Sequence, residues 1–243
     1  MKLYDSIITT VLDETKKAGV IEITDNANKP WPVTENSELV MMRDSAFELG
    51  GGMNPSTNYT LVSTEVSMDE DGVFLVGKDI SELSSDCPFA RIVIIKTEEI
   101  GESEEAYDAI RNMEFARYHV FPEGYMVRVS SQSNQEQVRL SNVAVRKGIN
   151  FSAVGKAYID KYKAIDHVLN VRIIFITDKE LVENLSQYAK KADDITKSLT
   201  HIYDGLATDC GHCDFKQVCD EVEGMKEMHL GMANKKKKEK TET

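Results

Sequence analysis

The spacing of hydrophobic and polar positions along the chain predicts four helical regions. Residues 3–17 carry apolar side chains at helical spacing and are followed by Gly19, a residue that commonly ends a helix. Residues 102–117 have acidic residues at the start and arginines toward the end, an order that suits the helix dipole. Residues 152–163 form the third region. Asp178 is a natural N-cap for the fourth, one helix or a helix pair that runs to about residue 203.

Between these regions the pattern changes to that of β-strands. Residues 90–96 and 167–177 are strongly apolar runs, which predicts two buried strands. Residues 60–66 and 73–76 are shorter β-type runs joined by an acidic turn, and residues 125–130 alternate as a strand does. The strands and helices follow no strict βαβ rhythm. We therefore expect an α/β or α+β fold, a mixed sheet layered with helices, followed by a helical, cysteine-rich C-terminal segment.

Turn-forming residues divide the chain further. Residues 24–37 are rich in turn formers and hold the only tryptophan, Trp31, which indicates a linker or an ordered surface loop. Three glycines at 50–52 lack the lysine of a phosphate-binding loop, so we expect a turn between strands. The predicted units are an N-terminal helix and linker (1–44), a middle domain (45–205), a cysteine-rich metal-binding segment (206–232) and a disordered lysine-rich tail (233–243).

The charge balance narrows the class of partner. The chain has 41 acidic and 29 basic residues and a net charge of −12. This argues against a nucleic-acid partner, because phosphate binding needs a positive surface. No apolar run approaches the roughly 20 residues that span a bilayer, and the N-terminal pattern is amphipathic, unlike a signal peptide. We expect a cytoplasmic protein without a membrane partner.

Candidate chemistry is concentrated near the C-terminus, where three of the four cysteines fall within ten residues. Cys210, Cys213 and Cys219 have the spacing C-x2-C-x5-C. Thiolates on one short loop can converge on a metal, and they suit an iron–sulfur cluster or zinc. His229, His212 and Cys87 are the candidates for a fourth ligand. We favour His229, so the predicted metal ligands are Cys210, Cys213, Cys219 and His229.

Two other interpretations of the cysteines stay open. Cys210 to Cys213 spell Cys-Gly-His-Cys, the active-site tetrapeptide of disulfide isomerases, where it opens a helix after a strand. Here it follows a long helical region and a third cysteine comes close behind, which argues against a thiol oxidoreductase. Three reduced structural thiols without a metal are the remaining alternative.

Several segments together resemble one family. They are residues 47–51 (FELGG), 58–62 (NYTLV), 71–80 (DGVFLVGKDI), 147–158 (KGINFSAVGKAY) and 171–178 (VRIIFITD). Their sequences and their order resemble the middle domain of carbon-monoxide-dependent acetyl-CoA synthase, the beta subunit of the CO dehydrogenase/acetyl-CoA synthase complex. The resemblance runs from about residue 45 to about residue 232.

The resemblance implies a metal site at the cysteines. In that family the domain is followed by an iron–sulfur cluster, bridged to two nickel ions, whose cysteines are spaced C-x2-C-x8-C-x9-C. Cys210 and Cys213 match the first two, Cys219 comes after a shorter gap, and His229 occupies the place of the fourth. This supports an iron–sulfur cluster with unusual ligation, or zinc. The chain has no Cys-x-Cys pair, so nickel is not expected and the polypeptide alone is not expected to make acetyl-CoA.

Three functions are consistent with these observations. The first is a stand-alone relative of the synthase in one-carbon metabolism, which binds an iron–sulfur cluster and a corrinoid iron–sulfur protein or another one-carbon protein. The resemblance also admits coenzyme A as a ligand. Candidate contacts are five basic residues that we expect to be exposed: Arg111, Arg117, Arg128, Arg139 and Arg146. The second is a subunit or fragment of a CO-methylating acetyl-CoA synthase, an acyltransferase that takes ligands from another chain. The third is a structural zinc-binding interaction domain.

Overall fold

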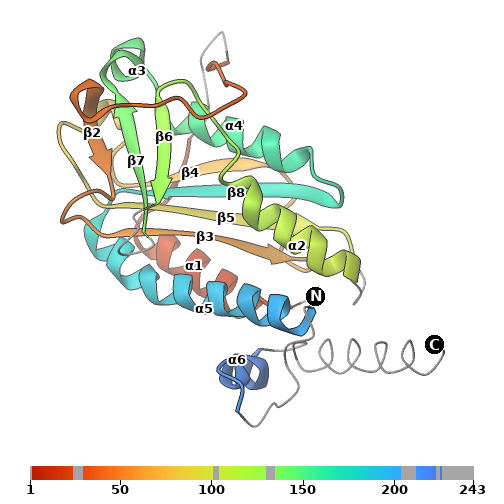
Figure 1. The fold of residues 1–243 in the computed structure, drawn as a ribbon. Helices are drawn as coiled ribbons and strands as arrows, with labels where there is room; N and C mark the ends of the chain where they lie inside the picture. Colours follow the sequence, from red (N-terminus) through yellow and green to blue (C-terminus); the bar gives the residue numbers. More distant parts are fainter. Residues whose placement is uncertain are drawn as a thin grey trace.

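Two β-sheets form the framework of the protein (Figure 1). The computed structural model describes residues 2–23, 30–100, 104–129, 135–203, 212–222 and 225. The five-stranded sheet has the order β1-β4-β8-β5-β3, and the three-stranded sheet has the order β2-β7-β6. The strands of the larger sheet are β1 (Ile21–Glu22), β4 (Gly72–Val76), β8 (Val168–Ile176), β5 (Phe89–Thr97) and β3 (Ser56–Ser63). Those of the smaller sheet are β2 (Ser45–Leu49), β7 (Glu136–Ser141) and β6 (Tyr125–Val129).

The larger sheet is mixed in direction. β4 is parallel to β8 and β3 is parallel to β5, whereas the central pair β5 and β8 is antiparallel. Consequently the carboxyl ends of β4 and β8 lie at the same edge as the amino ends of β3 and β5. The smaller sheet is antiparallel throughout.

Helices cover both faces of the larger sheet, which explains the apolar character of its central strands. The helices are α1 (Asp5–Lys17), α2 (Glu104–Ala116), α3 (Asn142–Lys147), α4 (Phe151–Lys163), α5 (Lys179–Tyr203) and α6 (Lys216–Glu221). Strands buried on both faces need apolar residues at consecutive positions rather than at alternate ones. β5 meets this need, since eight of its nine residues are buried.

The register of the sheet shows which helix lies on which face. Arg91 and Phe175 are paired across β5 and β8 and therefore point to one face, where α4 contributes Tyr158 and Phe151. Tyr59 on β3 points to the other face, toward Tyr188 of α5. α1 packs beside α5, and the Tyr4 hydroxyl lies 3.1 Å from the Thr196 hydroxyl. The apolar face of α1 belongs to the same core as the sheet.

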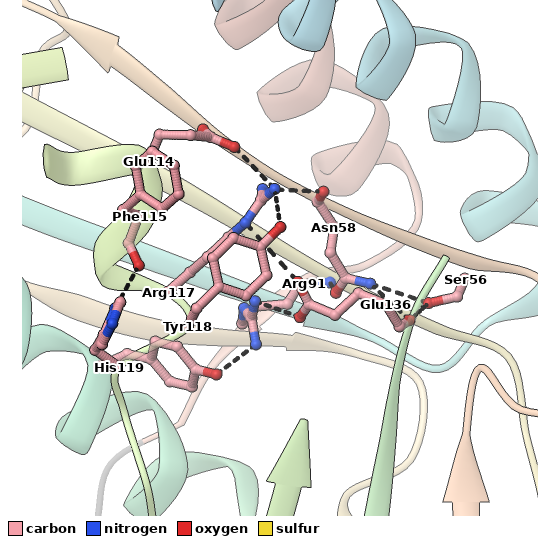
Figure 2. Close-up of polar contacts among 10 residues, drawn as sticks. Ser56, Asn58, Arg91, Glu114, Phe115, Arg117, Tyr118, His119 and Glu136 are labelled. Atoms are coloured by element: carbon pink, nitrogen blue, oxygen red, sulfur yellow. Dashed lines mark hydrogen bonds and ion pairs between the residues drawn. The ribbon is translucent and has the colours of Figure 1, made fainter. Parts of the chain in front are cut away.

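A buried chain of charges joins the two sheets (Figure 2). Arg91 on β5 has no exposed side-chain surface, and it donates hydrogen bonds to the Tyr158 hydroxyl at 2.5 Å and to the Glu136 carboxylate on β7. The Ser56 hydroxyl donates to the Glu136 carbonyl oxygen. Arg117, after α2, lies 3.8 Å from the other Glu136 carboxylate oxygen and 2.8 Å from Glu114. Two cations therefore face two anions in the core.

The electrostatics of this chain follow from its burial. Burial alone would lower the pKa of Arg91, but the adjacent Glu136 carboxylate and, to a lesser extent, three nearby tyrosine hydroxyls raise it, and together they outweigh the effect of burial. The guanidinium therefore stays charged. Burial also raises the pKa of Glu114, and the nearby Arg117 opposes that increase. Each charge is retained in the core because its partner is present.

Most of the elements expected from the sequence are confirmed. The predicted helices correspond to α1, α2, α4 and a single α5, and the predicted buried strands correspond to β5 and β8. The Asp178 carboxylate accepts a hydrogen bond from the Leu181 N–H at 2.9 Å and so caps α5. The mixed, helix-layered fold is also confirmed. In the described part of the chain, no helix is both long enough and apolar enough to cross a membrane.

Loop predictions had mixed outcomes. Residues 30–37 form an ordered surface loop, in which the Trp31 indole donates to the Glu123 carbonyl oxygen at 3.0 Å. The three glycines turn the chain from β2 to β3, as expected. The two strands joined by the acidic turn, β3 and β4, are not neighbours, because β5 and β8 lie between them. Sequence analysis did not identify β2, β7 or α3. The boundaries assigned to the domains remain predictions.

Removing the charge of Glu136 tests the buried pair. We expect Glu136→Gln to lower the free energy of unfolding by about 3–5 kcal/mol, because it leaves Arg91 charged, buried and without its counterion. Urea unfolding of the two proteins measures the difference. Glu65→Gln is the control, since the Glu65 side chain is 57% exposed and its ion pair lies at the surface. A loss no larger than that of the control would show that the pair does not stabilise the fold.

Gly155 provides a second test, at the contact between α4 and β4. A Cβ atom at Gly155 would lie 2.5 Å from Cγ1 of Val73. Alanine in place of glycine favours a helix by about 1 kcal/mol, but overpacking a core costs about 1–3 kcal/mol. We therefore expect Gly155→Ala to destabilise the protein in thermal unfolding and Val73→Ala to relieve this in the double variant. A stabilised Gly155→Ala would contradict the close packing.

Candidate functional site

The described part of the cysteine segment forms a turn and the short helix α6. The Cys213 carbonyl oxygen accepts a hydrogen bond from the Lys216 N–H at 3.1 Å, and the Cys219 N–H donates to the Phe215 carbonyl oxygen at 3.0 Å. Both cysteines are half-buried and neither forms a disulfide. The segment therefore presents two reduced thiols on one local structure.

Contacts with α5 hold this segment in place. The Cys219 sulfur lies 3.1 Å from the Ser198 hydroxyl oxygen of α5. Val222 and Met225 are buried in the core, and Val218 packs against it. Lys191 of α5 lies 3.9 Å from the Glu221 carboxylate. The sulfur of Cys219 is thus directed at the C-terminal half of α5.

Only two of the four predicted metal ligands lie among the residues that the structure describes. Cys210 and His229 lie outside the described residues, whereas Cys213 and Cys219 lie within them. Over the described ranges, no three His, Cys, Asp or Glu side chains come together in a group that could hold a metal ion. His212 is exposed and is not part of such a group. A metal site at this segment needs Cys210 or His229, and the predicted ligand set remains a prediction.

Cys87 lies in a different place, beside a pocket of about 320 Å³ that we call the strand-end pocket. The pocket opens where β4 and β8 end. It is lined by Gly77, Lys78, Glu82, Leu83, Ser84, Ser85, Cys87, Thr177 and Asp178. Burial raises the pKa of the Cys87 thiol to about 11, and Asp86 adds to the increase. A reactive cysteine needs a lowered pKa, so this thiol is not an activated nucleophile.

The length of α5 excludes Cys87 as the fourth ligand. Cys87 shares its pocket with Asp178, the N-cap of α5, whereas Cys219 contacts Ser198. Ser198 lies twenty residues beyond Asp178, and a helix rises 1.5 Å per residue, so the two sites are separated by about 30 Å. One metal ion or cluster cannot bridge that distance. The interpretation of Cys87 as a ligand is wrong.

A second hollow, the α2–α5 cleft, has a volume of about 410 Å³. Its lining includes Arg111, Arg117 and Lys197 together with Glu114 and Asp193. Arg117 is paired with Glu114 at 2.8 Å, and Lys197 is paired with Asp193 at 2.5 Å. These two pairs neutralise two of the three cations, and the third, Arg111, is exposed at the rim, so the cleft does not present a built anion site.

The five basic residues proposed as contacts divide into two groups. Arg111 and Arg146 are exposed, as expected. Arg117 belongs to the buried chain of charges, and Arg128 and Arg139 both donate to the Glu48 carboxylate at 2.6 Å. The expectation that these three are exposed is wrong, because Arg117 is largely buried against Glu114 and Glu136, and Arg128 and Arg139 are half-buried against Glu48.

Comparison with known proteins identifies the family. A search of curated proteins finds no match. The sequence profile described as the CO dehydrogenase/acetyl-CoA synthase complex beta subunit matches residues 33–182, more than half of the chain. The match extends from the loop before β2 to the first residues of α5, so it includes Cys87, whereas Cys210, Cys213 and Cys219 lie beyond it. The chain belongs to the family of the CO dehydrogenase/acetyl-CoA synthase complex beta subunit.

Proposed function

We propose that the protein binds an iron–sulfur cluster through Cys210, Cys213, Cys219 and His229 and acts with a corrinoid protein in cytoplasmic one-carbon metabolism. The observation that carries this proposal is the docking of Cys219 on α5, which holds a predicted ligand at a fixed place in a family member. Such a cluster would supply one-electron transfer. The residues of this chain would bind and orient it.

The donor set supports this assignment. Thiolates are soft, anionic ligands that suit iron–sulfur clusters and zinc. Both described cysteines of this segment are reduced and half-buried, and Val218, Val222 and Met225 pack the same part of the chain against the core. An apolar surrounding limits solvent access to a metal. Within the described residues, the strand-end pocket and the α2–α5 cleft offer no comparable ligand group.

The choice of partner follows from the family. The beta subunit family belongs to a complex of one-carbon metabolism. We propose a corrinoid iron–sulfur protein or another one-carbon protein as the partner, with coenzyme A as a further ligand to test. Arg111, on the rim of the α2–α5 cleft, and Arg146 at α3 are the exposed cations that remain available from the predicted contacts.

Metal analysis of protein purified without oxygen tests the proposal. We expect iron and acid-labile sulfide at about four each per chain, the content of a [4Fe–4S] cluster. Cys213→Ala and Cys219→Ala should lose most of both, because each removes one ligand. Cys87→Ala is the matched control and should keep both, since Cys87 lies at the strand-end pocket.

Each other outcome of this measurement has a defined meaning. Zinc without iron would replace the cluster by a structural zinc site. Nickel in stoichiometric amount would favour the alternative of an acyltransferase subunit that completes its site with another chain. Full loss of iron from Cys87→Ala, or no metal in the unaltered protein, would contradict the proposed ligand set.

We also propose that this polypeptide alone lacks acetyl-CoA synthase activity, because its 243 residues contain no Cys-x-Cys pair. Incubation with CO, a methylated corrinoid protein and coenzyme A should therefore yield no acetyl-CoA above a protein-free blank. Acetyl-CoA formation with this protein as the only nickel-binding component would overturn the proposal. A complete synthase in the same assay confirms that the substrates are competent.

A further inference from the structure

Ser198 is a buried hydroxyl residue on α5 whose side chain meets the cysteine segment. The residue is 1% exposed, and its oxygen lies 3.1 Å from the Cys219 sulfur. Burial of a hydroxyl without a hydrogen bond is costly. The sulfur of Cys219 provides the partner, so the contact links α5 to α6 through a polar interaction in a largely apolar interface.

Neighbouring hydroxyls of α5 serve other purposes. Thr196 donates to the Ala192 carbonyl oxygen and contacts the Tyr4 hydroxyl of α1. Thr200 donates to the Thr196 carbonyl oxygen and accepts a hydrogen bond from the Tyr107 hydroxyl of α2. With about 3.6 residues per turn, positions 196 and 198 point to different sides of the helix. Ser198 is therefore the hydroxyl of this trio that faces Cys219.

The direction of the hydrogen bond depends on the state of the sulfur. In the thiol, either atom can donate, although the S–H group is the weaker donor. A metal-bound thiolate has no proton, so Ser198 must then donate and Cys219 must accept. A hydrogen bond to an ionised acceptor is about twice as strong as one between neutral groups. Metal binding would thus strengthen a contact that is already formed.

We propose that Ser198 is a positioning residue of the metal site: its O–H group orients the Cys219 sulfur and sets the reduction potential of the bound cluster. This inference rests on the proposed function. Hydrogen bonds to the sulfurs are one of the factors that set the potential of an iron–sulfur cluster. A donor favours the reduced form, because that form carries more negative charge on sulfur. Outer partners of this kind also fix the orientation of a ligand.

Three variants of the full chain, reconstituted anaerobically with iron and sulfide, test the inference. Ser198→Ala removes the hydroxyl, Ser198→Thr keeps it, and Thr196→Val removes a hydroxyl from the same helix that does not contact a cysteine. Iron and sulfide content, thermal unfolding and the midpoint potential are measured for each. We expect Ser198→Ala to keep its fold and shift the potential to a more negative value, while the other two variants keep the wild-type potential.

The outcomes separate this inference from the proposed function. A cluster in Ser198→Ala with the wild-type potential overturns the role of Ser198 and leaves the cluster in place. Loss of the cluster from folded Ser198→Ala, with retention in Thr196→Val, supports positioning. If the unaltered protein binds zinc instead, Co²⁺ is substituted for the zinc, and the thiolate-to-cobalt absorption band is measured in place of the midpoint potential. A band at the wild-type wavelength in Ser198→Ala then overturns the inference. No metal in the unaltered protein overturns the proposed function itself.

Discussion

The ion pair between Arg91 and Glu136 is the constraint on which the arrangement of the two sheets depends. Removing either charge from water costs several kcal/mol, so each side chain can be buried only where the other is present. Arg91 comes from β5, one of the central pair of strands in the larger sheet, and Glu136 comes from the first position of β7. Glu136 also approaches Arg117 at 3.8 Å, and Arg117 pairs with Glu114 on α2. One neutral set of four charges therefore fixes the smaller sheet and the end of α2 against the same point of the larger sheet.

The separation of the two chemically distinct regions follows from α5. The helix begins at the strand-end pocket, where Asp178 caps it, and Ser198 near its other end contacts Cys219. A continuous helix is a rigid spacer, so the two regions stay about 30 Å apart. The raised pKa of Cys87 agrees with this division, because burial suppresses thiolate chemistry at the strand-end pocket. The proposed metal-binding chemistry therefore concerns the cysteine segment and not the strand-end pocket.

The sequence predicts the parts of this structure that are governed by local patterns. β5 and β8 are recognisable because burial on both faces demands continuous apolar residues, and α4 and α5 are recognisable from helical spacing and their caps. β7 escaped detection because its residues EQVRLS include Glu136 and Arg139, whose charges are compensated only by residues distant in sequence. The cysteine spacing predicts a metal site, and that site remains a prediction. The exclusion of Cys87 as a metal ligand and the contact between Ser198 and Cys219 both depend on the length of α5 and on how α6 packs against it. No local sequence pattern predicts either of these.

The contacts that stabilise the structure of the cysteine segment are the same contacts that attach it to the core. A helix of six residues such as α6 is not stable by itself, because nucleation costs more than so few hydrogen bonds return. Its stability must come from Val218, Val222 and Met225, which pack against the core, and from the contact between Cys219 and Ser198. A metal bound only by the docked segment would stabilise that docking by its own binding free energy. Conversely, a partner that separates α6 from α5 would weaken such a metal site, so binding of that partner and retention of the metal would be thermodynamically linked.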